Sequence, residues 1–423
     1  MAGVWHIPQL IIFLVGCGFV TSLIGWKRYV LLGWLMGCAA IGVAYYDQFF
    51  VDPIYLDGAK FNDTVLVDRL PVLHEGSQRL VVVTKEQQHL QLDADLYPEY
   101  RYGDVINLRC TIRLPKQIEG FAYDKYLARF HIQALCDYPT TAFVATNQGN
   151  KIITSIYEFR NNLRKRVESL WHEPAASLLL GVLIGEQDTI PISIYTSFQR
   201  AGVVHILVVS GMHVLLLVQL LTSFTKWLPK FYQTLVIVLA LTAFCVLTGF
   251  SATVIRATVM GSIPLLGRFI GRPHRIHLTL TWAAGVITLV NPYILVHDVG
   301  FQLSFLATLG LVYMTPFVKP FTKWLPEKFE LRDTVTTTLA ATTTTAPWIG
   351  YTFGTWSNVA MLSNIVVLPT SNLMLFAGGV ITALSVLFPN LAQMLATLLE
   401  VIINLLVQYV DWCAALPYAY IKW

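Results

Sequence analysis

The stretch V-V-H-I-L-V-V-S-G-M-H-V-L-L-L, residues 203–217, decides how this sequence is to be interpreted. It is apolar enough to belong to a membrane span, yet two histidines, a serine and a glycine interrupt it: His205, Ser210, Gly211 and His213. Lipid offers no water to satisfy polar groups, so such side chains are costly unless they face a cavity or other protein groups. The pattern therefore favours a span that lines a polar path over one that only anchors the protein.

The composition of the whole chain is typical of a helical membrane protein. Of its 423 residues, 55% are hydrophobic and only 13% are charged, and the mean hydropathy is +0.58. Apolar runs of about 20 residues, the length needed to cross hydrocarbon, recur along the sequence. The first run lacks the basic start and the cleavage site of a signal peptide, so we expect a retained span. The formal net charge of +4 is too small to indicate a partner.

Basic residues in short loops mark the cytoplasmic side and give the predicted topology. Lys27 and Arg28 separate spans at 9–25 and 29–46, so the turn of this hairpin (residues 1–46) is predicted inside. Further groups of Lys and Arg close alternate loops at 226–230, 268–275 and 319–332. The other predicted spans are 203–224, 232–250, 252–270, 278–295, 299–318, 333–351, 358–386 and 390–413. Both termini then lie outside.

Residues 47–150 interrupt the spans with a different pattern. Short runs with period-two alternation, such as T-V-L-V, R-L-V-V-V-T, H-L-Q-L and V-I-N-L-R-C-T-I-R-L, are separated by Gly, Pro, Asp and Asn. This alternation predicts a small antiparallel β-barrel or sandwich, and a five-stranded OB-like barrel fits the length. The topology places the insert outside, where Cys110 and Cys136 are predicted to pair. The predicted fold class is therefore an α-helical multi-pass membrane protein with a small extracytoplasmic β-barrel (OB-like) insert.

Residues 151–190 are predicted to lie at the membrane surface. Residues 151–171 have the pattern of an amphipathic helix, which either anchors to lipid headgroups or receives a polyanion. The residues 175–185 are apolar but too short to span, so they either dip into the membrane or pack against protein. The remaining residues, 191–423, are predicted to be a polytopic channel domain. The basic side chains of the amphipathic helix are Arg160, Arg164, Lys165 and Arg166.

Polar residues from separate spans are predicted to share one outer layer, because helix rise and topology place them at similar depth. An isolated Arg or Asp in hydrocarbon costs at least about 2.5–3.5 kcal/mol, which favours a shared hydrated vestibule. The alternative is a buried structural cluster in which Arg256 pairs with Asp298. His213 is predicted about 12–15 Å deeper, with Asn364 and Asn372 in a broken span. The outer layer comprises His205, Arg256, Asp298, Gln302 and Asn358.

Two chemical interpretations of the histidine motif compete with the polar path. Rings eight residues apart on a regular helix lie about 12 Å apart, too far to share one zinc ion, so no metal and no cofactor are predicted. Ser210 and His213 could form the nucleophile and base of a membrane-embedded hydrolase, but the sequence offers no orienting acid. A phosphate-cradling glycine-rich loop with its lysine is also absent from the sequence.

Several sequence blocks form a recognisable pattern, and the strongest are 205–213, V-I-R-A-T-V-M at 254–260 and N-P-Y-I-L-V-H-D-V-G-F-Q-L-S-F-L-A-T at 291–308. Weaker blocks are F-G-T-W-S-N-V at 353–359, N-I-V-V-L-P at 364–369 and G-F-A-Y-D-K-Y-L-A-R-F-H-I-Q-A at 120–134. In these blocks, and over almost its whole length, the chain resembles the ComEC family, the inner-membrane channel of bacterial competence for DNA uptake. The resemblance implies that one DNA strand passes the cytoplasmic membrane while the other is degraded outside. It assigns the path to His205, Ser210, Gly211, His213, Arg256, Phe301, Gln302 and Ser304.

One departure shapes the functional prediction. Many family members continue into a metallo-β-lactamase-like nuclease domain, but this sequence has no His-x-His-x-Asp-His cluster. We therefore expect a short form of the family that is a passive conduit for single-stranded DNA and not an enzyme. The partners expected are single-stranded DNA, membrane lipid, a separate extracytoplasmic DNA receptor or nuclease, and a cytoplasmic motor. The alternatives are a transporter of a smaller solute and the membrane-embedded hydrolase.

Overall fold

The computed structural model describes residues 55–74, 76–116, 123–207, 209–269, 276–326 and 331–422. The hairpin predicted at 1–46 lies outside these described residues. The chain divides into two compact units, which we name by their main content. The insert unit comprises Met1–Tyr157 with Ser262–Gln302, and the helical unit comprises Glu158–Gly261 with Leu303–Trp423.

A six-stranded sheet forms the β part of the insert unit. The strands are β1 (Lys60–Val67), β2 (Val72–His74), β3 (Ser77–Val83), β4 (His89–Asp95), β5 (Val105–Arg113) and β6 (Ile132–Ala145), in the order β1-β5-β6-β4-β3-β2. The first strand pairs with β5 and also with β3, where Leu66 lies opposite Val83. Neighbours are antiparallel except β4 and β6, which are parallel. The prediction of an antiparallel arrangement is therefore wrong for this one pair.

Alternation along the strands explains how the sheet buries its core. In β5, Ile106, Leu108, Cys110 and Ile112 are buried, whereas the residues between them are exposed or half-buried. Successive side chains of a strand point to opposite faces, so one face of β5 packs inward along its whole length. Cys110 is joined to Cys136 of β6 in a disulfide, with the two Cα atoms 5.6 Å apart.

Helical segments complete the insert unit. A short helix, α3 (Tyr123–Ala128), precedes β6, and α10 (Ile276–Val290) leads into α11 (Tyr293–His297), which α3 contacts. Two longer helices continue from one unit into the other along the chain: α9 (Ala252–Phe269) and α12 (Val299–Tyr313). The same is true of α4 (Lys151–Leu170), the helix predicted to be amphipathic.

The helical unit is organised around α5 (Ala175–Ile184). Its side chains, including Leu178, Leu179 and Leu180, are almost all buried in one apolar core with α6 (Ile192–Arg200), α15 (Ala360–Leu384) and α16 (Pro389–Ala415). A Cβ at Gly378 would lie only 2.7 Å from Cδ2 of Leu179, so α5 approaches α15 where a side chain is absent. The helix is thus packed inside the protein, and its predicted position relative to the membrane stays a prediction.

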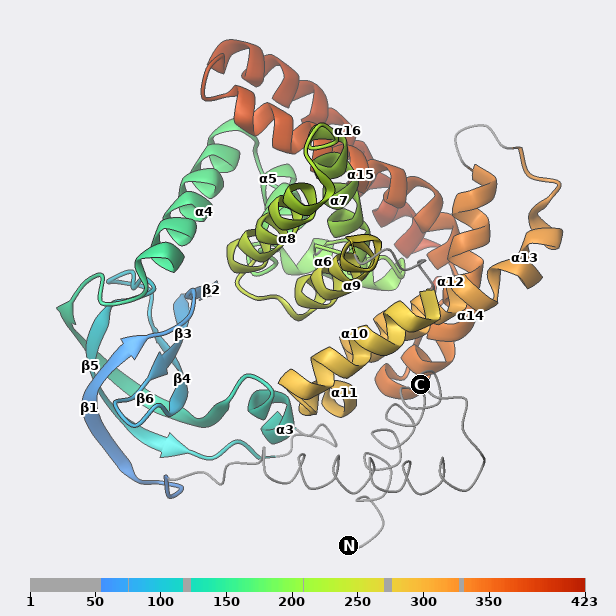
Figure 1. Ribbon diagram of the computed structural model, residues 1–423. Coiled ribbons are helices and arrows are strands. Elements are labelled where there is room, and N and C mark those ends of the chain that lie inside the picture. Colours follow the sequence, from blue (N-terminus) through green and yellow to red (C-terminus); the bar gives the residue numbers. More distant parts are fainter. Residues whose placement is uncertain are drawn as a thin grey trace, which may run out of the picture. The chain divides into compact units, whose positions relative to one another are not determined.

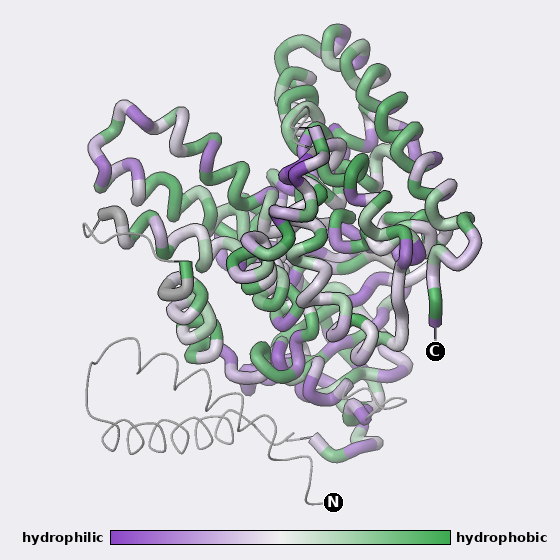
Figure 2. The backbone as a smooth tube through the Cα atoms, turned by 90° about the vertical axis from the view of Figure 1, so that its right-hand side faces the viewer, coloured by the Kyte–Doolittle hydropathy of each residue, from purple (hydrophilic) through white to green (hydrophobic). Residues whose placement is uncertain are grey.

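Four further helices belong to this unit, and the first two are more apolar than the last two. They are α7 (Gly211–Phe224), α8 (Lys230–Leu247), α13 (Thr315–Thr322) and α14 (Leu331–Phe353), with a two-stranded sheet of β7 (Thr355–Ser357) and β8 (Tyr420–Lys422). Figure 1 shows α15 and α16 as a long hairpin, and the tube in Figure 2 is largely hydrophobic along it. A helical turn, η1 (Val204–Ile206), precedes α7.

Within the described residues, four helical segments are long and apolar enough to cross a membrane: Val204–Phe224, Lys230–Leu247, Ala360–Leu384 and Pro389–Ala415. A fifth is added if α12 and α13, which are bent by 61° at their junction, count as one span. The apolar parts of α9 and α10 are shorter, at Thr253–Gly267 and Thr279–Val290. The helix-rich architecture fits a membrane protein, and the ten-span topology stays a prediction.

Candidate functional site

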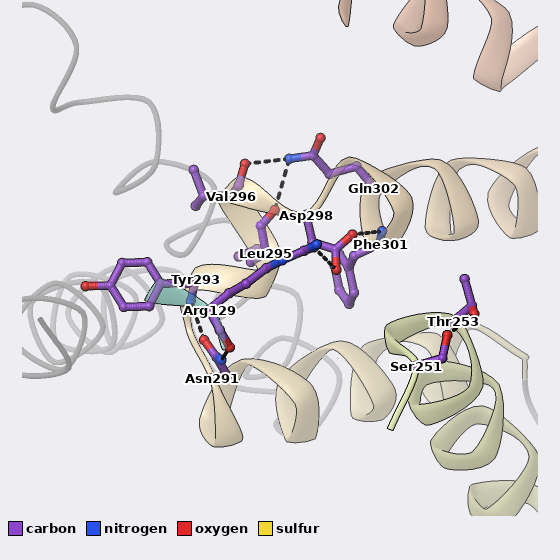
Figure 3. A network of polar contacts seen from close by, with 10 residues as sticks. All are labelled: Arg129, Ser251, Thr253, Asn291, Tyr293, Leu295, Val296, Asp298, Phe301 and Gln302. Atoms are coloured by element: carbon purple, nitrogen blue, oxygen red, sulfur yellow. Dashed lines mark hydrogen bonds and ion pairs between the residues drawn. The ribbon is translucent and has the colours of Figure 1, made fainter. Parts of the chain in front are cut away.

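A buried polar network links two segments of the insert unit that are far apart in sequence. Arg129, just after α3, points at Asp298, which precedes α12 (Figure 3). Their Nη1 and Oδ2 atoms are 2.6 Å apart, and both side chains are at most 10% exposed. The guanidinium also lies over the rings of Tyr126 and Phe130, at 4.0 and 4.5 Å from the ring centroids. We call the four polar residues Arg129, Asp298, Asn291 and Gln302 the Arg129 network.

The other members of the network terminate helices. Oδ1 of Asp298 accepts the backbone N–H of Phe301 at 2.9 Å, which is the bond of a helix N-cap, and a carboxylate there is also favoured by the helix dipole. Gln302 donates Nε2 to the carbonyl oxygen of Val296 at 2.9 Å. Asn291 accepts the N–H of Tyr293 at 3.0 Å and donates to the carbonyl oxygen of Arg129 at 2.7 Å. The block at 291–308 is therefore a compact helix–turn–helix tied to the end of α3.

This geometry changes the role expected for Asp298 and Gln302. The sequence pattern placed both in a polar path, with Arg256 as the alternative partner of Asp298. The carboxylate instead has an ion pair with Arg129, which the pattern does not indicate, and the Gln302 amide donates to backbone. The pairing of Arg256 with Asp298 stays a prediction. The missed signal was Arg129 itself, a basic residue between aromatic neighbours in the block at 120–134.

In the helical unit, the histidine motif is a break and not a continuous helix. The turn η1 contains His205, and α7 begins at Gly211 with Ser210 as its N-cap. The depth estimate that treats 205–213 as one regular helix is therefore wrong. The two histidines also differ, since His205 is exposed whereas His213 is 1% exposed.

His213 takes part in the start of its own helix. Its Nδ1 accepts the backbone N–H of Ser210 at 3.2 Å, so the ring completes a capping box in which the third helical residue bonds back to the N-cap. Nδ1, the ring nitrogen nearest Ser210, therefore bonds to backbone in this structure. In the described part of the chain, no group of three or more His, Cys, Asp or Glu side chains could hold a metal ion.

The break before α7 packs closely against two other helices, α5 and α9. A Cβ at Gly181 of α5 would collide with the carbonyl oxygen of Leu207, so the glycine allows α5 to reach the irregular backbone. A Cβ at Gly211 would lie 3.9 Å from Cβ of Ala257, which places the start of α7 beside α9. The neighbour of Ala257 is Arg256, which is 4% exposed. Two sequence blocks predicted to share a path, 205–213 and 254–260, therefore lie side by side.

Some buried polar atoms of the helical unit have no hydrogen-bond partner among the described residues. They include Nε2 of His213, Oγ of Ser210, Oδ1 of Asn364 and Oδ1 of Asn372. The two asparagines were expected in a broken span, but α15 continues through Pro369, so this expectation is wrong. Buried polar groups are nearly always paired, so each such atom requires an explanation in terms of strain, function or contact with water.

Asn358, expected in the outer layer, has a structural role. Its side chain donates to the carbonyl oxygen of Tyr418 at 2.7 Å, and its backbone N–H donates to that of Ala419 at 2.9 Å. These bonds fasten the strand β8 beside β7. Ser357 continues the attachment by donating its hydroxyl to the carbonyl oxygen of Arg200.

The basic helix α4 does not present its four cations alike. Arg160 is 6% exposed and donates Nη1 to the carbonyl oxygens of Ile184 and Leu247, at the ends of α5 and α8. Arg164 pairs with Glu186 at 3.2 Å and with Glu168 at 2.8 Å. The expectation that Arg160 lies on an open basic surface is therefore wrong. Lys165 and Arg166 are exposed, as a receiving surface requires.

Exposed aromatic side chains occur on the insert. Among the tyrosines near residue 100, Tyr97 is 74% exposed, whereas Tyr100 is buried and donates its hydroxyl to Thr141. On β6, Tyr138 is 90% and Phe143 is 50% exposed. Exposed rings of this kind are available to stack on a ligand, whereas the buried Tyr100 belongs to the core of the sheet.

Two titratable groups of the insert are shifted by their surroundings. The hydrogen bond from His89 lowers the pKa of Asp68, so this carboxylate is ionised at neutral pH. Burial lowers the pKa of His131, which follows the turn at Arg129, so this imidazole is neutral near pH 7. The turn that holds Arg129 therefore carries no further positive charge from its histidine.

Comparisons with known proteins agree with the sequence blocks. A family model described as "Competence protein" matches residues 182–423. The ComE operon protein 3 of Bacillus subtilis (strain 168) is 24% identical over 263 residues, which cover 62% of this chain and 33% of that protein. The match thus spans a third of the length of this relative. No solved structure matches the chain.

Proposed function

Because the chain belongs to the competence protein family of DNA-uptake proteins, we propose that it is the conduit through which one DNA strand crosses the cytoplasmic membrane. The observation that carries this proposal is the break before α7. Irregular backbone and buried polar groups at membrane depth are tolerated only inside protein or beside a water-filled cavity. Here an interrupted span carries an unpartnered Nε2 on His213, judged among the described residues, and lies beside the helix of Arg256.

The strand is received, in this proposal, by an OB-like barrel. The strand pairings of the insert run from β1 through β5, β6, β4 and β3 and return to β1, which is the ring needed to close a small barrel. OB barrels bind single strands by combining cations that follow the phosphates with aromatic rings that stack bases. Within the insert unit, Tyr97, Tyr138 and Phe143 supply exposed rings for such stacking.

The insert lies outside the cytoplasm in this proposal. Disulfides persist in oxidising compartments, and the Cys110–Cys136 bond supports that location. In this proposal the conduit itself carries out no chemistry. Degradation of the second strand and the pulling force then come from a separate extracytoplasmic nuclease or receptor and from a cytoplasmic motor.

The test is strand entry into liposomes that contain the purified protein. A single-strand-binding protein sealed in the lumen would trap any strand that enters, and nuclease added outside would remove the rest. We expect a labelled single strand to become nuclease-resistant only in liposomes with the protein, whereas double-stranded DNA of the same sequence stays sensitive. Flux of small solutes without any protection of the strand would overturn the proposal in favour of a solute transporter.

A further inference from the structure

Two blocks that lie far apart in the sequence meet within the insert unit. The turn after α3 comes from the block at 120–134, and the start of α12 comes from the block at 291–308. They are held by two contacts of different kinds: an ion pair from the Arg129 side chain to Asp298, and a hydrogen bond from Asn291 to the Arg129 backbone. Both the position of the turn and the direction of its arginine are therefore specified.

Contacts with aromatic rings hold the Arg129 guanidinium in the orientation in which it pairs with Asp298. Tyr126 and Phe130 lie on the faces of the Arg129 head group, and the Phe130 carbonyl also accepts Nη2 of Arg69 at 2.8 Å. A planar guanidinium held in this way loses little further freedom when it pairs, unlike a flexible lysine ammonium. The arginine is therefore suited to fixing a geometry.

The Asp298 carboxylate connects Arg129 to the start of α12. Asp298 caps α12 through the N–H of Phe301, so the residue that Arg129 holds is also the residue that starts the helix. A buried ion pair adds little net stability compared with well-packed apolar groups, and its best-supported use is to select one arrangement among several. Apolar side chains at this junction would stabilise it about as well, so the ion pair is better explained by its fixed geometry than by its contribution to stability.

We propose that Arg129 is a positioning residue that fixes the start of α12 to the insert, so that a strand received by the insert is handed over at a defined place. The role of Arg129 in holding α12 stands on the contacts above, whereas its use in handing over DNA rests on the proposed function. Without Arg129, the insert still binds DNA but the start of α12 loses its fixed position.

The test uses a double variant, Arg129→Met with Asp298→Asn, in the full chain. Asparagine is as good an N-cap as aspartate, and removing both charges leaves no buried ion of this pair without its counterpart. We expect normal monodisperse yield, unchanged affinity for a labelled single-stranded oligonucleotide, and at least tenfold lower strand entry. Hydrogen exchange of the peptide 291–302 should be at least tenfold faster, because its anchor is removed.

The matched control is Arg69→Met, which removes a different cation that binds the carbonyl oxygen and the ring of Phe130. It should leave the exchange of 291–302 and strand entry unchanged, and Arg129→Lys with native Asp298 should restore part of both. Unchanged exchange in the double variant would overturn the positioning role. Failure of the native protein to admit DNA, together with faster exchange in the variant, would instead refute the proposed function and retain the role of Arg129.

Discussion

The Arg129 network and the break before α7 are both buried and polar, yet they differ in how their polar atoms are satisfied. In the network, Asp298 and Asn291 each have protein partners on two sides, and Gln302 donates to backbone carbonyls. At the break and in α15, His213 and Asn364 each keep a buried polar atom without a partner among the described residues. The network is not fully satisfied either, since Nε of Arg129 also lacks a hydrogen-bond partner among the described residues. Its charged and amide groups are nevertheless paired between two distant segments, which is the mark of a structural cluster.

The difference has an energetic meaning. A buried group that loses its partner costs about 1–3 kcal/mol, and more if it is charged, so changes in a satisfied network should affect folding first. An atom that already lacks a partner has no such bond to lose, so changing it should affect function first. The two regions therefore predict opposite outcomes in assays of stability and of DNA uptake.

The largest effect is expected from Asp298→Ala. This change removes the N-cap of α12 and leaves Arg129 as a buried cation without its carboxylate, which should lower the free energy of unfolding by about 3–5 kcal/mol. The measurement is thermal unfolding in detergent together with monodisperse yield. Asp188→Ala is the matched control, because Asp188 is exposed. Equal stability of the two variants would contradict the structural role of the network.

The next effect concerns His213 and separates its capping role from a role in the path. Glutamine is a standard partner in a capping box, so His213→Gln should keep the acceptor for Ser210 and leave folding intact. If Nε2 faces the path, uptake of DNA into a nuclease-resistant form should nevertheless fall at least tenfold. The assay requires cells in which the variant replaces the native protein. Native uptake by His213→Gln would reduce the histidine to a cap.

A smaller effect is expected at Asn364. Stability and DNA uptake are compared here too, but Asn364 lies inside α15 and does not cap a helix. Replacing an unsatisfied buried polar group with an apolar group of similar size is close to neutral or stabilising, so Asn364→Leu should unfold at the native temperature or above it. Uptake should fall severalfold, because the span loses a polar group. Ser363, which donates to the carbonyl oxygen of Val359, provides the control: Ser363→Ala should leave uptake native. A lower unfolding temperature in Asn364→Leu would show that the asparagine has a structural partner.

Sequence patterns predicted the type of most elements but not their partners. Alternation in β5 predicts its buried face, and cysteine location alone pointed to Cys110 and Cys136. The break at Ser210 was missed because the apolar pattern continues through it, and only the N-cap and glycine hint at a helix start. Arg129 was missed because its partner lies at residue 298, and no local pattern specifies so distant an interaction.

The smallest effect extends the comparison to one helix, α4, where satisfied and exposed cations lie a few residues apart. Lys165→Gln with Arg166→Gln removes exposed charge, so the slope of log affinity against log salt for a single strand should flatten by about 0.7 for each phosphate that is no longer neutralised. Arg160→Gln should leave that slope unchanged and lower stability instead, because the native guanidinium binds the carbonyl oxygens that end α5 and α8. Fluorescence anisotropy at several salt concentrations measures the slope, and thermal unfolding measures the stability. A slope that responds to Arg160 but not to Lys165 and Arg166 would reverse the assignment, since the buried arginine would then have to leave its carbonyl partners to reach DNA.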